Sequence, residues 1–227
     1  MNPAPDQPLP PRPPRTPRTP RTRRFVVGVT GASGALYAQR VVRCILGAGH
    51  EVHLAVTPYG SRLFHDELGL ERLDDAGLAS FAGLPEGADP RGHGLFHYPA
   101  RDVGAPIGSG SFRHDGMVIV PCSSHTMNAL ASGAGDTLVT RAAHVALKER
   151  MPLVIAHRES PLTLIDIRSM ETLTLSGAII APCSPGFYLL PRSVEEVVDF
   201  VAARLLDLLR VEHGLKVRWE VFLEEGA

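Results

Sequence analysis

Short apolar segments alternate with longer amphipathic segments along most of the chain. The short segments are rich in valine and isoleucine and are apolar on both faces, as the buried strands of a parallel sheet are. We predict strands over 25–29, 51–56, 117–120, 153–156 and 178–180. Between them, apolar residues at helical spacing predict helices over 35–46, 60–67, 137–149, 162–175 and 194–210. This alternation implies right-handed crossovers and an α/β fold with a doubly wound parallel sheet.

Two stretches depart from this pattern. Residues 1–24 hold nine of the 20 prolines and six arginines against one acidic residue, Asp6. Because proline lacks an amide donor and disfavours helix in the residue before it, we expect a largely disordered arm. The arm is either a polybasic contact segment or an unselected extension. Residues 72–115 show no steady period of apolar positions, so we expect a long excursion over one sheet edge. Residues 25–227 as a whole are predicted to form a single domain.

Composition and charge narrow the classes of function. Hydrophobic residues are 44% and charged residues 21% of the 227, as in soluble globular proteins. The net charge is −1, and because the arm contributes +5, the body carries −6, which argues against a nucleic-acid partner. No segment approaches the roughly 20 apolar residues of a membrane span. Three widely spaced cysteines without a CxxC pair favour a cytoplasmic protein without a disulfide framework or cysteine zinc site.

The residues that follow each predicted strand are the candidate site, because ligands of doubly wound sheets bind beyond the carboxyl ends of the strands. After the first strand, a GxxGxxG stretch with Gly28, Gly31 and Gly34 opens a helix. Glycines permit close backbone approach, and a helix start presents amide groups to an anion. The spacing differs from the dinucleotide and Walker motifs, and favours a mononucleotide phosphate loop over a simple packing turn.

Polar side chains also follow later strands. A run of hydroxyls over 121–126 suits hydrogen bonding to a polar ring or a phosphate. Arg158 and Glu159 follow the fourth strand, where a buried Glu159 would shuttle protons and an ordinary ion pair is the alternative. Pro185-Gly186-Phe187-Tyr188 follows the fifth strand and presents an aromatic pair.

Three cations complete the candidates. Arg141 and Lys148 are two helical turns apart and share a helix face, which either receives a phosphate or is simply solvated. Arg204 lies between apolar neighbours in the last predicted helix. We expect it on or beside the buried face, where an arginine needs an anionic partner.

Taken in order, these motifs resemble the UbiX-type flavin prenyltransferases. The resemblance runs from about residue 25 to residue 219 and is carried by 28–35, 109–112, 121–123, 141–150, 152–154, 158–162 and 185–188. It implies a flavodoxin-like Rossmann fold assembled into a homododecamer. It also implies that reduced FMN is alkylated by dimethylallyl monophosphate at N5 and then at C6, without a metal. The product, prenylated FMN, would pass to a UbiD-type decarboxylase.

The resemblance also implies roles for individual residues of the flavin site. FMN would be held by Gly31, Ala32, Ser33, Thr57, Ser123, Ser124, His125, Thr126 and Arg158. Ser33 and Glu159 would manage protons around flavin N5. Thr57 stands where the family usually has serine, which keeps the hydroxyl and adds a methyl group.

The prenyl donor would have its own residues. Its phosphate would be bound by Lys148, Tyr188 and Arg204. A neighbouring subunit would contribute Arg141, and Glu67 would complete the site from another subunit. Trp219 would line the pocket for the prenyl group. Charge-assisted bonds suit the leaving phosphate, and aromatic faces suit an allylic cation.

Two other functions are compatible with this type of fold. A flavin-dependent peptidyl-cysteine decarboxylase relies on a catalytic histidine and a Pro-Ala-Ser-Ala-Asn type stretch, where this chain has Pro-Cys-Ser-Ser-His over 121–125. A non-catalytic FMN-binding subunit needs none of Glu159, Lys148, Tyr188 and Arg204. Their joint presence therefore favours prenyl transfer.

Overall fold

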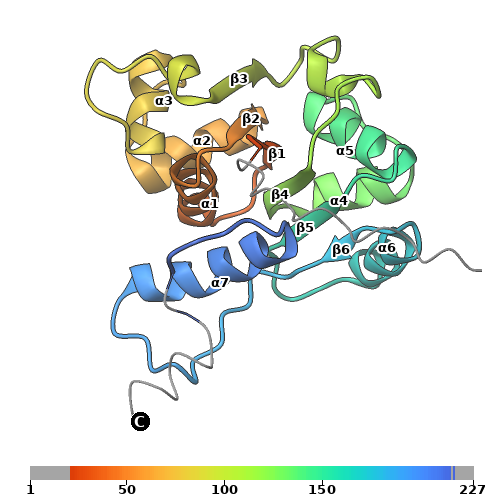
Figure 1. Cartoon of the computed structure of the whole chain (residues 1–227). Coiled ribbons are helices and arrows are strands. Elements are labelled where there is room, and N and C mark those ends of the chain that lie inside the picture. The colour runs from red at the N-terminus through yellow and green to blue at the C-terminus, as the bar shows by residue number, and fades with distance from the viewer. Residues whose placement is uncertain (1–20, 216, 218–227) are drawn as a thin grey trace, which may run out of the picture.

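A parallel sheet lies between two layers of helices in the computed structural model, which describes residues 21–215 and 217 (Figure 1). The described residues form six strands: β1 (Arg24–Val29), β2 (Glu51–Val56), β3 (Leu95–Pro99), β4 (Gly116–Cys122), β5 (Leu153–His157) and β6 (Ile179–Ile180). Every neighbouring pair is parallel. The predicted doubly wound α/β architecture is thereby confirmed.

The strand order places the site. The order is β3-β2-β1-β4-β5-β6, which is that of a Rossmann sheet. Without the edge strand β3, the remaining five strands follow the flavodoxin order. The sheet therefore agrees with the expected flavodoxin-like Rossmann fold. The order reverses between β1 and β4, and a doubly wound sheet opens its ligand crevice at such a reversal.

The two helical layers bury opposite faces of the sheet. One layer holds α1 (Ala35–Gly47), α2 (Pro58–Leu68), α3 (Asp75–Ala82) and α7 (Val194–Leu208); the other holds α4 (Ser124–Ala131), α5 (Leu138–Lys148) and α6 (Leu164–Leu175) (Figure 1). Along β1, Val27 and Val29 face the first layer, whereas Val26 faces the second. Because successive strand side chains alternate in direction, β1 is apolar on both sides, as a central strand must be.

A charged pair joins helix α7 to α1, and a serine side chain caps the start of α7. The guanidinium of Arg40 donates to both carboxylate oxygens of Asp199, at 2.9 Å for the Nη2 bond. Ser193 Oγ accepts from the amide of Glu196 and so caps the start of α7. The Glu196 carboxylate accepts from the Arg192 amide at 2.6 Å.

The stretch over 72–115 contains regular structure that its pattern does not reveal. Helix α3 begins after Asp74, whose carboxylate accepts from the Gly77 amide at 3.0 Å. Strand β3 follows a 3-10 turn (Arg91–His93) and covers the edge of β2; a second such turn (Pro106–Gly108) precedes β4. An edge strand with polar residues such as His97 lacks the apolar signature of the inner strands.

The end of the basic arm contacts the folded body. Strand β1 begins at Arg24, one residue before the expected start. The Arg23 guanidinium donates to the carbonyl oxygens of Leu209 and Arg210, at 3.0 and 2.6 Å, which satisfies free carbonyls after α7. Residues 1–20 lie outside the described residues, so the disordered arm stays a prediction. Within the described part of the chain, no helix is both long and apolar enough to cross a membrane.

Candidate functional site

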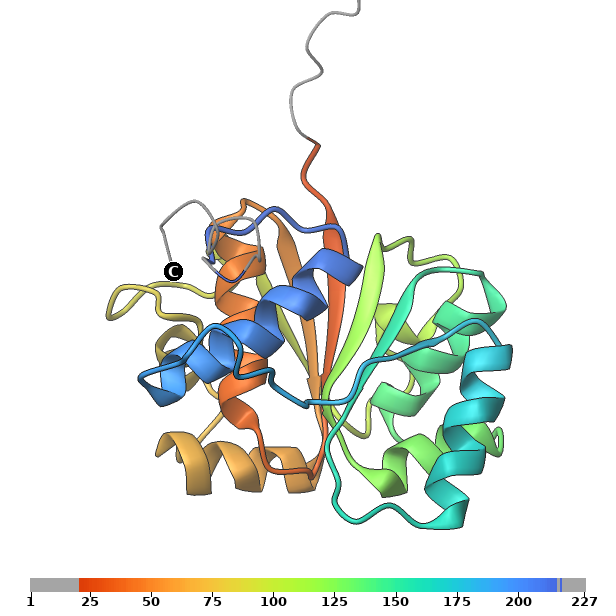
Figure 2. The same ribbon diagram turned by 90° about the horizontal axis from the view of Figure 1, so that it is seen from below.

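A cavity of about 570 Å³ lies at the carboxyl ends of the central strands. Figure 2 shows these ends at the bottom of the sheet, where α1, α2 and α4 begin. Six of the residues implied to hold FMN line the cavity, namely Gly31, Thr57, Ser123, Ser124, His125 and Thr126. Glu159 also lines it and is exposed in the single chain. The burial that proton transfer by Glu159 requires is therefore not supplied by the described residues alone.

Three helices begin at the cavity, and each is capped by a hydroxyl. Thr57 Oγ1 accepts from the Gly60 amide at 3.1 Å, and Ser123 Oγ accepts from the Thr126 amide at 3.3 Å. Thr137 caps α5 in the same way. Helix N-termini carry partial positive charge and unpaired amide donors, so their convergence makes this cavity suited to an anionic group.

The glycine loop after β1 is packed tightly against α2. A Cβ atom on Gly31 would lie only 2.5 Å from Cβ of Tyr59, and Gly34 has a positive φ of 131°. The loop is therefore both a close-packing turn and part of the cavity wall. Tyr59 lines the cavity with 78% of its surface exposed, and sequence reasoning missed it. Tyr59 directly follows Thr57 and Pro58 at a strand end, and this position in the sequence could have marked it as a site residue.

The start of α1 is not free to receive an anion. The carboxylate of Glu67, on α2 of the same chain, accepts from the Gly34 amide at 3.0 Å and from the Ala35 amide at 2.7 Å. Within its own chain the Glu67 carboxylate is engaged at the start of α1, and its expected part in a phosphate site of another subunit stays a prediction. The negative charge suits the positive end of the α1 dipole.

Ala32, Ser33 and Arg158 lie beside the cavity wall rather than in it. Ala32 is buried, whereas Ser33 is exposed. The Arg158 guanidinium donates to the Ser33 carbonyl oxygen at 3.0 Å. This bond ties the residues after β5 to the loop after β1, two segments that sequence reasoning assigned to one site.

A buried threonine holds the two central strands together at the crevice. Thr30 Oγ1 donates to the Pro121 carbonyl oxygen at 2.9 Å and accepts from the Ser123 amide at 2.8 Å. Thr30 therefore positions the start of the hydroxyl run. Sequence reasoning missed this residue, which sits inside the glycine stretch without being one of its glycines.

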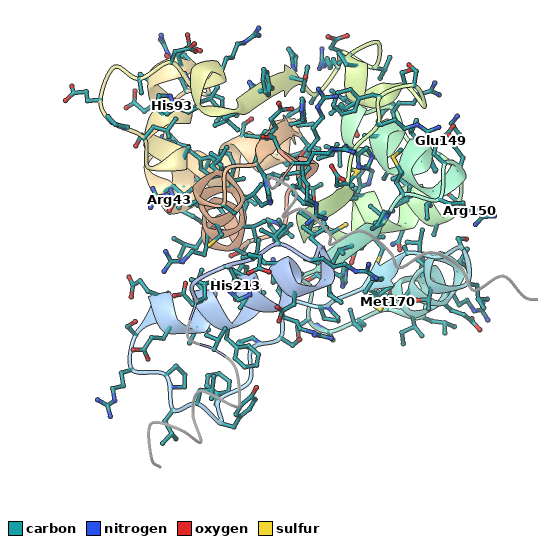
Figure 3. The ribbon with its side chains drawn as sticks, in the orientation of Figure 1. Arg43, His93, Glu149, Arg150, Met170 and His213 are labelled. Atoms are coloured by element: carbon teal, nitrogen blue, oxygen red, sulfur yellow. The ribbon has the colours of Figure 1, made fainter. Side chains whose placement is uncertain are left out.

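The cations of α5 lie along one exposed face, as the seven-residue spacing predicts. Arg141 Nε donates to the Gly108 carbonyl oxygen at 3.0 Å, and Lys148 Nζ donates to Glu149 Oε1 at 2.8 Å. A Cβ atom on Gly110 would lie 2.9 Å from Lys148 Nζ, so both cations border the same loop. Figure 3 shows Glu149 at the outer side of the α5 layer, with Arg43 of α1 on the other side of the molecule.

Tyr188 and Arg204 belong to the opposite layer. The Tyr188 ring meets the Phe200 ring edge-on, with 5.5 Å between centroids, and Arg204 is one helical turn beyond Phe200. Arg204 is exposed, so the expected burial is wrong: α7 turns Val201 and Leu205 inward and Arg204 outward. Because Lys148 is on the other side of the sheet, one chain does not bring it together with Tyr188 and Arg204. Trp219 lies outside the described residues.

Replacing Gly31 by alanine is expected to disturb the cavity selectively. The new methyl group would collide with Tyr59, and we expect a loss of about 1–3 kcal/mol in the free energy of unfolding together with weaker FMN binding. Gly47→Ala is the matched control, because nothing lies within 4 Å of its added Cβ. Chemical denaturation and flavin fluorescence titration measure both effects; equal behaviour of the two variants would contradict the close-packing role.

The chain is similar to known flavoproteins over most of its length. A model of the Flavoprotein family matches residues 14–206. The flavin prenyltransferase UbiX of Halalkalibacterium halodurans is 42% identical over 185 residues, which cover 82% of this chain and 87% of that protein. The crystal structure of AnUbiX in complex with FMN and dimethylallyl pyrophosphate is 36% identical, with a TM-score of 0.74, covering 88% of this chain and 98% of that one.

Two further structures bear on assembly and on the rival function. A dodecameric FMN-dependent UbiX-like decarboxylase from Escherichia coli O157:H7 is 34% identical, with a TM-score of 0.73, covering 86% of this chain and 98% of that one. The FMN-dependent cysteine decarboxylase TvaF is 17% identical, with a TM-score of 0.52, covering 80% of this chain and 98% of its own, which is a likeness of fold alone. The chain therefore belongs to the Flavoprotein family and, within it, to the UbiX-type flavin prenyltransferases.

Proposed function

We propose that the protein transfers the dimethylallyl group of dimethylallyl monophosphate to N5 and C6 of reduced FMN. The product, prenylated FMN, is delivered to a UbiD-type decarboxylase in the cytoplasm. The observation that carries the proposal is the cavity at the strand-order reversal, lined by helix-capping hydroxyls and by Glu159. Membership of the UbiX-type family, with a relative that holds FMN and a prenyl donor, supports it.

The cavity residues fit FMN. Each cap pairs one amide, that of Gly60 in α2 and that of Thr126 in α4. The other amides of the first turn, which lack intrahelical partners, can donate to a phosphate. Gly31 lets the loop after β1 pack closely on Tyr59, whose ring lies at the cavity wall. Bound reduced FMN supplies the nucleophile for the transfer.

The donor residues favour a site built between subunits. Departure of phosphate from an allylic carbon is favoured by cations on the phosphate and by aromatic faces near the developing positive charge. Arg141 and Lys148 supply cations from α5, whereas Tyr188 and Arg204 come from the α7 layer of the opposite face. We infer that α5 of one subunit completes the site beside Tyr188 and Arg204 of another.

The surface of α6 supports assembly into a homo-oligomer. Leu164, Ile165 and Ile167 are 61%, 65% and 52% exposed on this helix, and Leu175 is 83% exposed. Several large apolar side chains exposed on one helix favour its burial against another subunit. A dodecamer, as in the relative from Escherichia coli, is the assembly we propose.

The decisive test is direct. The protein is incubated anaerobically with reduced FMN and dimethylallyl monophosphate, and the released flavin is examined by mass spectrometry. The expected product is a flavin heavier by one five-carbon prenyl unit, absent when the donor is omitted. Tightly bound but unmodified FMN would contradict the proposal; oxidation of a cysteinyl peptide would then identify a cysteine decarboxylase, and its absence a non-catalytic FMN-binding subunit.

A further inference from the structure

A cluster of aromatic rings joins β2 and β3 to the loop that precedes β4. His53 of β2 is 5% exposed and lies at its centre. The His53 ring stacks on Phe96 of β3, with 4.9 Å between centroids, and meets the Phe112 ring of the loop edge-on, with 4.7 Å between centroids. His53 Nδ1 is 3.0 Å from the Tyr98 hydroxyl oxygen, and Tyr98 and Phe112 both pack against the core of the α5 layer. The cluster therefore ties the end of the loop to the sheet.

The ring of Phe112 is surrounded by side chains from three parts of the sheet. Besides His53, it has the His114 ring at 6.5 Å between centroids and the Arg24 guanidinium carbon at 5.8 Å from its own centroid. These distances lie within the range of aromatic and cation–π pairs. His114 is 8% exposed, and burial lowers the pKa of both histidines, which favours neutral rings in this apolar setting.

The loop that ends at Phe112 borders the two cations of α5. The Gly108 carbonyl oxygen accepts from Arg141 Nε at 3.0 Å. A Cβ atom on Gly110 would lie 2.9 Å from Lys148 Nζ. The other end of the loop is held by Ile107, which is 2% exposed. The segment over 108–111 therefore lies against α5 between two apolar anchors, Ile107 and Phe112.

We propose that Phe112, held by His53 and His114, is a positioning residue that keeps the 108–111 loop against α5 and thereby orients Arg141 and Lys148. The inference rests on the proposed function, which gives these two cations the phosphate of the prenyl donor as their ligand. Long cationic side chains lose conformational freedom when they bind, so a loop that limits their freedom beforehand strengthens binding. Phe112 lies outside the lining of the FMN cavity, so its effect is on the donor.

The first test needs neither flavin nor donor. Hydrogen exchange of the full-length protein is followed by mass spectrometry over the loop, where the Gly108 and Ser109 amides donate to the carbonyl oxygens of Ala105 and Pro106. Phe112→Ala is expected to speed exchange of the loop amides by about tenfold. Phe96→Ala is the matched control, because Phe96 is also half-buried and packs on the same His53 ring but belongs to β3. Unchanged exchange in Phe112→Ala, or equal acceleration in both variants, would overturn the proposal whatever reaction the protein catalyses.

The second test is kinetic. Phe112→Ala is expected to lower kcat/KM for dimethylallyl monophosphate by about tenfold to a hundredfold and to leave FMN affinity within about twofold of wild type. Phe96→Ala should stay within about threefold of wild type in both measurements. In a Lys148→Ala background the Phe112→Ala change should cost less than in wild type, because one of the cations that it positions is already gone. Equal losses in the two phenylalanine variants, or fully additive losses with Lys148→Ala, would indicate packing alone and overturn the proposal.

A conservative variant keeps the test open if alanine prevents folding. Phe112→Leu retains apolar bulk but lacks the ring that meets His53, so it should show faster loop exchange and lower kcat/KM, each to a smaller extent than alanine. A leucine variant equal to wild type in both measurements would overturn the role of the ring. A wild-type protein that forms no prenylated flavin would overturn the proposed function and the orientation of the cations for donor phosphate, and hydrogen exchange would then decide the loop anchor by itself.

Discussion

Replacing Glu159 by glutamine is expected to slow prenyl transfer by about a hundredfold to ten-thousandfold, the usual contribution of a positioned proton carrier, while FMN binding stays near wild type. Glu159 lines the cavity and accepts from the Ser160 amide at 3.0 Å. Glutamine retains the size of the side chain and an oxygen for that bond. It removes the carboxylate that can take up and release a proton, so the chemical step is affected more than binding.

Single-turnover kinetics with saturating donor isolates that step. The amount of prenylated flavin is followed by mass spectrometry after rapid quenching, and FMN affinity is measured separately. Glu86→Gln is the control, because Glu86 is an exposed loop residue outside the cavity lining. A Glu159→Gln enzyme that transfers the prenyl group at the wild-type rate would remove Glu159 from the proton path.

The hydroxyls of the cavity were predictable from sequence because their placement is local. Each strand end delivers the next residues to the same edge of the sheet, and a serine or threonine before a helix caps that helix in its own first turn. The run from Ser123 to Thr126 was expected because it directly follows a predicted strand, whereas Thr57 was expected only from the family resemblance, although it caps α2 in the same way.

Contacts between distant segments were not predictable in this way. Glu67 reaches the start of α1 because α2 packs beside α1, and nothing in the pattern of either helix specifies the meeting of a carboxylate with those amides. Asp166 meets Asn128 through the packing of α6 on α4. The exposure of Arg204 depends on which stripe of α7 faces α1. Its neighbours Val201 and Leu205 belong to the buried stripe, whereas Arg204 lies next to that stripe and is exposed.

Mixed oligomers of Lys148→Ala and Arg204→Ala subunits are expected to regain activity that neither variant has alone. Loss of one cation from the phosphate site should lower transfer by about a hundredfold to a thousandfold. If Lys148 comes from one subunit and Arg204 from another, random co-assembly leaves about a quarter of the sites with both residues. The mixture should therefore recover about a quarter of wild-type activity, measured after co-expression with two different tags and sequential purification.

The matched control uses two residues of one helix face. Arg141 and Lys148 both border the loop at Gly108 and Gly110, so a site receives them from the same α5. Mixing Arg141→Ala with Lys148→Ala subunits leaves every site without one cation, and no recovery is expected. Recovery in the first mixture and not in the second would locate the prenyl phosphate between α5 of one subunit and α7 of another. Failure of both mixtures would mean that each subunit assembles its phosphate site alone, which would require α5 and α7 to approach each other across a sheet that separates them here.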